Sequence, residues 1–454
     1  MSLTPPMKLQ KLQAALHAKA KASPNQRFHA LYDKVYRSDV LAHAYACCQA
    51  NGGAEGVDGQ TFTDIEQYGP VRWLGELAEE LRVKTYRPSP VRRVWIPKPD
   101  GKQRPLGIPT IKDRVVQTAA MLVLEPIFEA DLQPEQCAYR SDRSALDAVN
   151  RVRKLLNSGH KQVVDADLSG YFDSIPHAEL MQCLARRIVD GAMLHLLKMW
   201  LETPVEEIDE RGNKQRTTRN KDEGRGTPQG SPISPLLSNL YMRRFVLGWK
   251  TLGHEARLDA HIVNYADDFV ICCRHTAAEA MAAMRGMMTA LKLTVNEAKT
   301  HVREVPTETF DFLGYTFGLH WTHRTKRMLL CRSRSRLGRV HPSKKRVARV
   351  CERISAITDR RRSSLAVPKM VAELNRVLRG WAGYFCMGPV SDTYGAINAH
   401  VRYRFRTWWG AKHKVGKRKR RKFGPRWYWS PWLEQTFGLL QLRWDPSRLP
   451  QAKT

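Results

Sequence analysis

Two groups of aspartates in this sequence are spaced so that together they could bind divalent cations. Asp165 and Asp167 alternate with apolar residues, and alternate side chains of a strand share a face, so the opposite face carries Val164, Ala166 and Leu168. Asp267 and Asp268 separate two apolar runs, which predicts a tight hairpin with both carboxylates at its turn. An aspartate pair in a turn is more often only a polar turn, so the interpretation rests on both groups.

The hairpin and the first strand predict a metal site if they lie side by side. Asp167 and Asp267 could then bridge two Mg²⁺ ions about 3.5–4 Å apart, with Asp268 close by. Adjacent carboxylates between buried strands repel each other unless a cation compensates them. Two such ions catalyse in-line phosphoryl transfer by activating a hydroxyl nucleophile and neutralising the leaving pyrophosphate. We expect two Mg²⁺ ions as cofactor, with Mn²⁺ as a substitute, and Asp165 is the alternative first ligand.

The charge of the chain indicates a polyanionic partner. Lys and Arg number 75 against 44 acidic residues, a formal charge of +31 over 454 residues. This excess favours nucleic acid over a membrane. The beginning of the sequence lacks the apolar segment of a signal peptide, and no run approaches about 18 apolar residues, which disfavours secretion and membrane insertion. The nine cysteines contain no Cys-x-x-Cys pair, so we expect reduced thiols in a cytoplasmic protein.

The elements that must position these carboxylates predict an α+β domain. Residues 91–317 alternate strand-like runs with helical runs at 113–128 and 277–291. Residues 7–22 predict an amphipathic helix with a basic face, which either contacts RNA or only packs on the body. The catalytic body is therefore expected before residue 320.

The composition changes sharply in the C-terminal third. No acidic residue lies between Asp311 and Glu352, and a second acid-free stretch separates Asp392 from Glu434. Two amphipathic helices are expected between these stretches, the second opening at Pro368. In the second stretch, cations interleaved with tryptophans suit phosphates and unstacked bases, the alternative being that the tryptophans form a minor core. The expected domains are 1–90, 91–320, a helical domain at 321–392 and a basic, aromatic-rich tail at 393–454.

Several motifs together resemble the blocks of bacterial group II intron-encoded reverse transcriptases and maturases. The segment Tyr265-Ala266-Asp267-Asp268 is similar to the signature of that family, and the segment from Asp167 to Asp173 is similar to its preceding aspartate block. The resemblance implies an α+β right-hand polymerase with fingers and palm, an α-helical thumb or maturase domain and a basic C-terminal extension. It also selects Asp167, rather than Asp165, to act with Asp267 and Asp268 in catalysis and metal binding.

Further blocks imply roles for other residues by the same resemblance. Nucleotide contacts fall on Lys98, Arg104, Phe172, Gln229 and Lys299. Phe172 would exclude a ribose 2′-hydroxyl, with plain core packing as its alternative, and a glycine next to Gln229 would let the backbone approach closely. Template and primer contacts fall on Arg140, Arg143, Tyr265, Leu313, Gly314 and Tyr315, although the segment holding the two arginines lacks the Pro-Gly turn usual in the family. Basic contacts with RNA or DNA fall on Lys344, Lys345, Arg346, Arg379, Lys417, Arg418, Lys419, Arg420 and Arg421.

The resemblance implies an RNA-directed DNA polymerase that also assists intron splicing and retrohoming. Its partners would be an RNA template, group II intron RNA, a DNA primer or target and deoxynucleoside triphosphates, in the bacterial cytoplasm at the nucleoid, with a dimer as one option. No cysteine follows Cys386, so the metal-binding nuclease of many relatives is not expected, and priming would come from elsewhere, such as a replication fork. The alternatives are a host-adopted enzyme of repair or defence and an RNA-folding maturase without catalysis.

Overall fold

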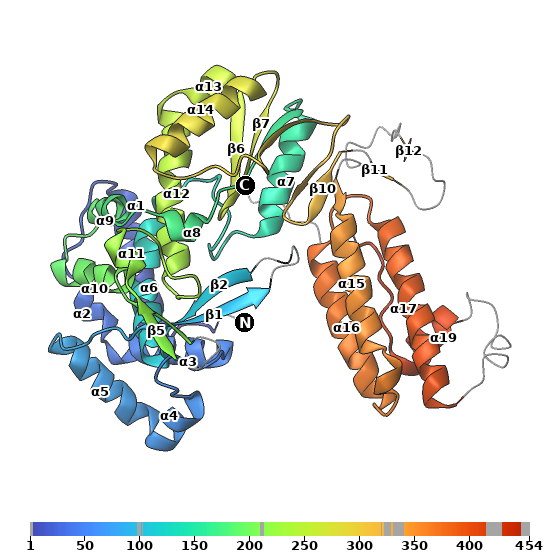
Figure 1. Cartoon of the computed structure of the whole chain (residues 1–454), viewed down its shortest axis with the longest axis horizontal. Coiled ribbons are helices and arrows are strands. Elements are labelled where there is room, and N and C mark those ends of the chain that lie inside the picture. The colour runs from blue at the N-terminus through green and yellow to red at the C-terminus, as the bar shows by residue number, and fades with distance from the viewer. Residues whose placement is uncertain are drawn as a thin grey trace.

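The computed structural model describes residues 3–97, 101, 103–208, 213–318, 320–321, 328–329, 340–414 and 429–445. Figure 1 shows a large body of helices and sheets joined to a group of long helices, which we call the helical domain. The buried apolar side chains form three clusters, one within the body, one beneath the junction and one within the helical domain.

The central sheet lies in the body and has the strand order β6-β7-β3-β8, with every neighbouring pair antiparallel. Its strands are β3 (Gln162–Ala166), β6 (Ala260–Tyr265), β7 (Asp268–Cys273) and β8 (His301–Glu304). Val164 and Ala166 of β3 face the first cluster, as the alternation predicts, but Val163 is also buried, in the second cluster. Both faces of the sheet are therefore covered, which explains why β6 and β7 are almost continuously apolar.

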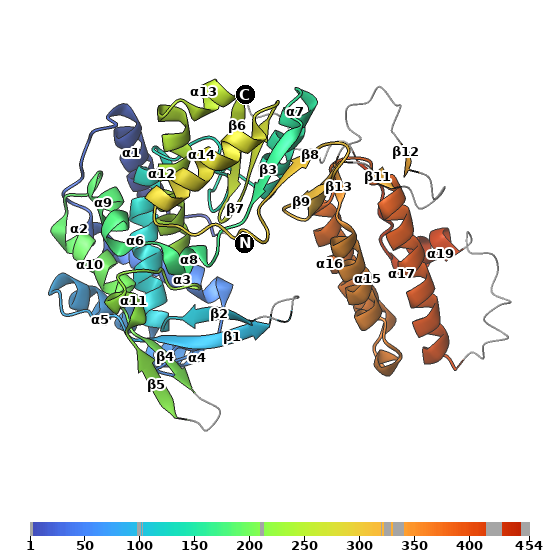
Figure 2. The ribbon, with the colours of Figure 1, turned by 45° about the horizontal axis from the view of Figure 1, so that its top comes forward.

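Helices cover the two faces of the central sheet, as Figures 1 and 2 show. On one side lie α14 (Ala277–Ala290) and α12 (Ser234–Thr251), and on the other lies α7 (Ala145–Asn157). A capping box at Ser144 begins α7, because the Ser144 hydroxyl and the Asp147 carboxylate each bond the backbone N–H of the other residue. The expected helices at 113–128 and 277–291 are confirmed as α6 (Ile111–Glu129) and α14.

The N-terminal part of the body packs around α6. The predicted helix at 7–22 is confirmed as α1 (Met7–Ala22), which buries Leu9, Leu16 and Ala20 and leaves its lysines exposed. The other helices of the body are α2 (Tyr32–Val35), α3 (Ser38–Asn51), α4 (Phe62–Tyr68), α5 (Pro70–Arg82), α8 (Tyr171–Ser174), α9 (His177–Ala185), α10 (Gly191–Leu201), α11 (Arg219–Asp222) and α13 (His254–Leu258).

A second sheet, with the order β2-β1-β4-β5, lies beside the central one. It contains β1 (Val91–Pro97), β2 (Gln103–Ile108), β4 (Val205–Ile208) and β5 (Lys214–Thr217). Strands β1 and β2 pair antiparallel, with Ile96 opposite Arg104. Lys98 lies outside the described residues.

The helical domain follows a three-stranded sheet of β9 (Phe310–Phe312), β10 (Tyr315–Phe317) and β13 (Val340–Pro342). Between β10 and β13 a short pair forms from β11 (His320–Trp321) and β12 (Met328–Leu329). The domain consists of α15 (Lys344–Ile357), the short 3₁₀ helix η1 (Arg360–Arg362), α16 (Val367–Tyr384), α17 (Ser391–Lys412) and α19 (Trp429–Phe437). The two predicted amphipathic helices are α15 and α16, and Pro368 lies in the first turn of α16, where its missing N–H has no cost.

The boundary expected at residue 392 does not separate two packed units. The third cluster contains Val350 and Leu374 from the first two helices together with Phe405 and Trp408 of α17 and Leu442 beyond α19. Trp408 has no exposed surface and donates its indole N–H to the Arg362 carbonyl at 3.0 Å. The described part of the expected tail therefore shares the core of the helical domain, and for Trp408 the minor-core alternative holds.

Eight of the nine cysteines lie in the described residues, and no two of these eight are joined by a disulfide bond. Within the described parts of the chain, every helix is too short or too polar to cross a lipid bilayer.

Candidate active site

The pairing of strands brings Asp167, Asp267 and Asp268 to one end of the central sheet. The last paired residues of β3 and β7 are Ala166 and Phe269, so the next residues, Asp167 and Asp268, lie opposite each other. The β6–β7 pairing ends at Tyr265 and Asp268, which places Asp267 in the turn between them. The sequence interpretation of two aspartate groups side by side is confirmed.

The turn that carries Asp267 is held by a buried asparagine. Ala266 has φ +59°, and the Asn264 side-chain amide donates to the Ala266 carbonyl at 2.8 Å. Asn264 is fully buried, and its backbone N–H and carbonyl bond to Glu135 and Cys137. These contacts fix the turn from behind, so the aspartates project from a rigid support.

The carboxylates are close enough to perturb one another. Surrounding protein displaces water from the Asp268 carboxylate, although part of the residue is exposed, and with the charges of Asp267 and Asp167 it raises the pKa of Asp268 to about 6. Burial, with the charge of Asp268 next in importance, raises the pKa of Asp165 to about 7. Oxygen donors crowded in this way fit a hard divalent cation, which would remove their repulsion.

Asp167 is held by the segment that follows α14. Its carboxylate accepts hydrogen bonds of 3.0 Å from Lys299 Nζ and from the Asn296 side-chain amide. The Asn296 backbone N–H also donates to the Asp167 carbonyl at 2.8 Å. Lys299, expected near the nucleotide phosphates, therefore lies directly at the carboxylate site, and Asn296 is a supporting residue to which sequence reasoning gave no role.

Arg104 and Gln229, both expected at the nucleotide, lie together beside this site. Arg104 Nε donates to the Gln229 side-chain oxygen at 3.1 Å, and the Gln229 amide donates to Asp173 at 3.1 Å. The Gly107 backbone N–H donates to the Gln229 carbonyl at 2.6 Å. A Cβ at Gly230, which has φ +111°, would lie 2.3 Å from the Gly107 carbonyl oxygen, so only glycine allows this approach.

Phe172 lies between the core and the glutamine loop. Its side chain is 7% exposed and belongs to the first cluster, and its carbonyl accepts the Thr227 backbone N–H at 2.7 Å. This position is compatible with both expected roles, a gate beside the nucleotide sugar and core packing. The gate therefore stays a prediction.

Sequence reasoning gave no role to Tyr139, which faces the aspartates. The residue is 48% exposed and has φ +55°. The surrounding protein, and after it the charge of Asp267, raise the pKa of its hydroxyl. Its place is set by the contact between Cys137 and Asn264 of β6, a pairing of distant segments that no local pattern announces.

The two arginines expected at the template have different surroundings. Arg140 is 7% exposed at its side chain, and its guanidinium bonds to the Glu129 carboxylate and to the carbonyls of Gln133 and Gln136. Its donors are thus directed at protein groups. Arg143 is exposed and remains a candidate for template contact.

The segment Leu313–Tyr315, which was expected to contact the primer, packs against the helical domain. The Leu313 carbonyl accepts from the Tyr384 hydroxyl at 2.8 Å, and a Cβ at Gly314 would lie 2.9 Å from Arg346 Nε. Tyr315 is fully buried at this junction, so it supports the hairpin from within. The charge of Arg346 partly opposes the rise in the pKa of Asp268, which places this arginine near the carboxylates.

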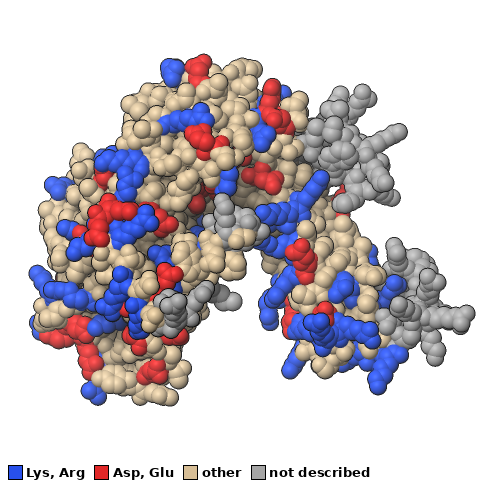
Figure 3. All heavy atoms as spheres, in the orientation of Figure 1, with Lys and Arg blue, Asp and Glu red and all other residues tan. Residues whose placement is uncertain are grey.

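The remaining basic residues lie on the outside of the helical domain. Lys344, Lys345, Arg346 and Arg379 are exposed. Figure 3 shows an open hollow between the body and the helical domain, with Lys and Arg side chains gathered along the helical side of it. Lys417, Arg418, Lys419, Arg420 and Arg421 lie outside the described residues.

Comparison with known proteins finds two families in succession along this chain. Residues 96–317 match the reverse transcriptase (RNA-dependent DNA polymerase) family, and residues 347–429 match the maturase-specific domain of group II introns. Protein YkfC of Escherichia coli strain K12 is 33% identical over 346 residues, which cover 68% of this chain and 88% of that protein.

More distant matches cover less of each protein. The group II intron-encoded protein LtrA of Lactococcus lactis subsp. cremoris is 31% identical over 229 residues, covering 49% of this chain and only 36% of that relative. A solved structure titled partial Cas6-RT-Cas1–Cas2 complex overlaps with a TM-score of 0.35 and 22% identity, covering 57% of this chain and 41% of the other, which is too distant to support a conclusion.

A carboxylate site at the end of an antiparallel sheet, with an arginine and a glutamine beside it, defines a template-directed nucleotidyltransferase of the reverse transcriptase class. The chain belongs to the family of group II intron-encoded reverse transcriptases and maturases. It is an RNA-directed DNA polymerase that carries a group II intron maturase domain.

Proposed function

We propose that Asp167, Asp267 and Asp268 hold two Mg²⁺ ions for DNA synthesis on an RNA template. The observation that carries this proposal is the strand register, which puts all three residues at one end of the central sheet. Asp165 lies opposite Val270, two residues further into the sheet, so Asp167 is the better placed first ligand. The bound ions would activate the primer 3′-hydroxyl and neutralise the leaving pyrophosphate, and Mn²⁺ would substitute for Mg²⁺.

The protein's own groups would position the two reactants. Lys299 and Asn296 hold the Asp167 carboxylate by hydrogen bonds, and Lys299 would also meet the triphosphate. Arg104 would exchange its bond with Gln229 for a bond to a phosphate oxygen, since a charge-assisted contact is stronger than one with a neutral amide. Gln229 would then lie against the nucleotide sugar, with Phe172 excluding a 2′-hydroxyl and Lys98 joining Arg104 on the triphosphate.

The template, an RNA strand, and the DNA primer would lie in the hollow between the body and the helical domain (Figure 3). Gly314 lies against Arg346, whose charge acts on Asp268, so the Leu313–Gly314 turn would support the primer end beside the carboxylates. Arg143 and Tyr265 would contact the template strand. The helical domain would serve as the thumb of the polymerase.

The same helical domain would bind group II intron RNA during splicing and retrohoming. Lys344, Lys345 and Arg379 present exposed cations on α15 and α16, and counterion release makes such contacts the main source of RNA affinity. Lys417, Arg418, Lys419, Arg420 and Arg421 would add positive charge for RNA. Lys344, Lys345 and Arg379 are not among the carboxylate-site residues, so RNA folding would not require catalysis.

A parallel assay of primer extension and splicing tests both activities. The wild-type chain, the Asp267→Ala/Asp268→Ala variant and an Asp33→Asn control are each given an RNA template, a DNA primer, deoxynucleoside triphosphates and Mg²⁺. Asp33 is exposed on α2 and pairs only with its neighbour Lys34 among the described residues. We expect extension by the wild type and the control, and none by the double variant.

Splicing of the RNA that flanks the reading frame is followed in the same proteins. Splicing by the double variant would assign the maturase activity to the basic surfaces. If the wild type binds RNA but extends no primer with any divalent ion, the polymerase proposal fails and RNA folding alone is left.

A further inference from the structure

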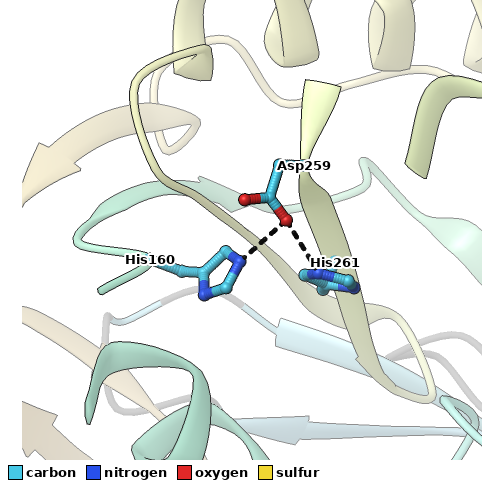
Figure 4. A group of neighbouring side chains, drawn as sticks. All are labelled: His160, Asp259 and His261. Atoms are coloured by element: carbon cyan, nitrogen blue, oxygen red, sulfur yellow. Dashed lines mark hydrogen bonds and ion pairs between the residues drawn. The ribbon is translucent and has the colours of Figure 1, made fainter. Parts of the chain in front are cut away.

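Two histidines and an aspartate converge at the end of the central sheet that lies opposite the catalytic carboxylates. Figure 4 shows His160 and His261 directed at one oxygen of Asp259. His160 Nε2 lies 3.1 Å from Asp259 Oδ1, and His261 Nε2 lies 3.3 Å from the same atom. The candidate ligand atoms of the three residues lie within 4.8 Å of one another.

The two separations between histidine nitrogen and aspartate oxygen are similar to those between neighbouring ligands of a Zn²⁺ ion. Zn²⁺ is bound by imidazole nitrogen and carboxylate oxygen at about 2.0–2.2 Å, so neighbouring ligand atoms in a tetrahedron lie roughly 3.3–3.6 Å apart. Both separations between histidine and aspartate are already close to this value. The candidate ligand atoms lie within 4.8 Å of one another, so the two imidazole nitrogens would have to move closer together on binding the ion.

The other nitrogen of each imidazole already has the partner that a zinc ligand needs. His160 Nδ1 lies 3.0 Å from the Ser158 hydroxyl, which gives its own proton to the Leu155 carbonyl at 2.9 Å and so accepts from the ring. His261 Nδ1 lies 3.4 Å from a Glu255 carboxylate oxygen. Histidines that bind metals donate their second N–H to a carbonyl, hydroxyl or carboxylate in this way, which fixes the tautomer.

The hydrogen-bond partners of His261 also favour a cation between the two rings and Asp259. His261 lies between the carboxylates of Asp259 and Glu255, which are both acceptors, and a neutral imidazole has only one N–H to give them. A single cation bound to both Nε2 atoms and to Asp259 satisfies all the acceptors, while Arg274 Nε holds the second Asp259 oxygen at 2.7 Å.

We propose that His160, His261 and Asp259 form a structural Zn²⁺ site. Imidazole ligands favour Zn²⁺ over Mg²⁺, whereas the all-carboxylate site at the other end of the sheet favours Mg²⁺. His160 is 5% exposed, Asp259 and His261 are half-buried, and the open side leaves room for a water molecule as fourth ligand. The bound ion would distinguish this end of the sheet chemically from the catalytic end.

The position of the site implies that the bound ion would hold two strands of the central sheet together. His160 lies two residues before β3, which leads to Asp167, and His261 lies in β6, which leads to Asp267. Strand β7 separates β3 from β6, so the ion would tie together the two strands that flank β7. Fixing both strands at their beginnings would keep their far ends, and the catalytic aspartates, in register.

The test uses the full-length, tag-free chain, stripped of metal with a chelator and then titrated with Zn²⁺ in the presence of millimolar Mg²⁺. Co²⁺ serves as the spectroscopic probe, because tetrahedral Co²⁺ absorbs visible light strongly. The variants are His261→Gln, Glu255→Gln and, as a matched control, His195→Gln at an exposed position on α10. The Asp267→Ala/Asp268→Ala chain reports on the catalytic end separately.

We expect one tightly bound Zn²⁺ per chain, a tetrahedral Co²⁺ spectrum and a Tm several degrees higher with Zn²⁺ than without it. His261→Gln should lose all three effects, and Glu255→Gln, which keeps every ligand, should bind about 10–100-fold more weakly. His195→Gln and the Asp267→Ala/Asp268→Ala variant should bind Zn²⁺ as the wild type does, with the same Co²⁺ spectrum and the same rise in Tm on adding Zn²⁺. Zn²⁺ binding that Mg²⁺ displaces, or that His261→Gln retains, would overturn the proposal without touching the polymerase assignment.

Discussion

Replacing Gly230 by alanine tests how closely the glutamine loop must approach strand β2. The residue has φ +111°, and its new Cβ would lie 2.3 Å from the Gly107 carbonyl oxygen. Such a backbone conformation costs a non-glycine residue roughly 1–3 kcal/mol. The loop and the strand can relieve the clash only by separating, which breaks the 2.6 Å hydrogen bond from Gly107 to the Gln229 carbonyl, a loss of about 1 kcal/mol. We therefore expect a stability loss of about 2–4 kcal/mol.

The same separation moves Gln229 away from Arg104 and so opens the nucleotide site. We expect kcat/KM for deoxynucleoside triphosphates to fall at least about tenfold, which corresponds to roughly 1.4 kcal/mol. Urea unfolding and steady-state primer extension measure the two effects. Gly224→Ala is the matched control, because Gly224 also has a positive φ, +60°, but no described atom lies within 4 Å of its Cβ position. If Gly230→Ala is no less stable than Gly224→Ala and has wild-type kcat/KM, the close approach is unimportant and the reasoning is wrong.

Three further substitutions separate structural residues from nucleic-acid contacts. Arg140→Ala should lower the free energy of unfolding in urea by roughly 3 kcal/mol, because Glu129 loses its largely buried partner. The affinity of the folded variant for the template, measured by filter binding, should stay unchanged. A variant with normal stability and lower affinity would contradict this. Trp408→Ala should cost about 3–5 kcal/mol and leave RNA affinity intact, and a stable variant with weak RNA binding would show that the indole contacts bases instead. Lys344→Gln/Lys345→Gln should keep wild-type stability but reduce the slope of log K against log salt by about 1.4 for single-stranded RNA, and an unchanged slope would remove α15 from the RNA surface.

The catalytic end of the sheet was predictable because its signals are local. Alternation around Asp167 and the two apolar runs around Asp267 fix strands and a turn, and the register then follows from burying the apolar side chains. A close backbone approach at the glycine next to Gln229 was also predicted, although the sequence did not indicate that β2 is the neighbour. The burial of both faces of the central sheet was not predicted, because the alternation of polar and apolar residues indicates one open face.

Features that depend on distant pairing were not predictable. Tyr139 is placed near the aspartates by a hydrogen bond between Cys137 and Asn264 of β6, which lie far apart in the sequence. The histidine pair joins residues 160 and 261, which have no common pattern in the sequence.

One error had a visible signal. Tyr394, Ile397, Val401, Phe405 and Trp408 recur at three- and four-residue spacing, which predicts a buried helix face. The many cations of α17 obscured this stripe and suggested a separate tail.

The most direct test of the proposed metal ligands locates the bound ions themselves. Fe²⁺ replaces Mg²⁺ in the full-length protein, and ascorbate with hydrogen peroxide then generates hydroxyl radicals that cut the backbone next to each bound ion. The account predicts cuts beside Asp167 and the Asp267–Asp268 turn, suppressed by excess Mg²⁺ and lost in Asp267→Ala/Asp268→Ala. Cuts elsewhere only, or cuts at these positions that the double variant retains, would contradict the assignment of these aspartates as the metal ligands of the polymerase.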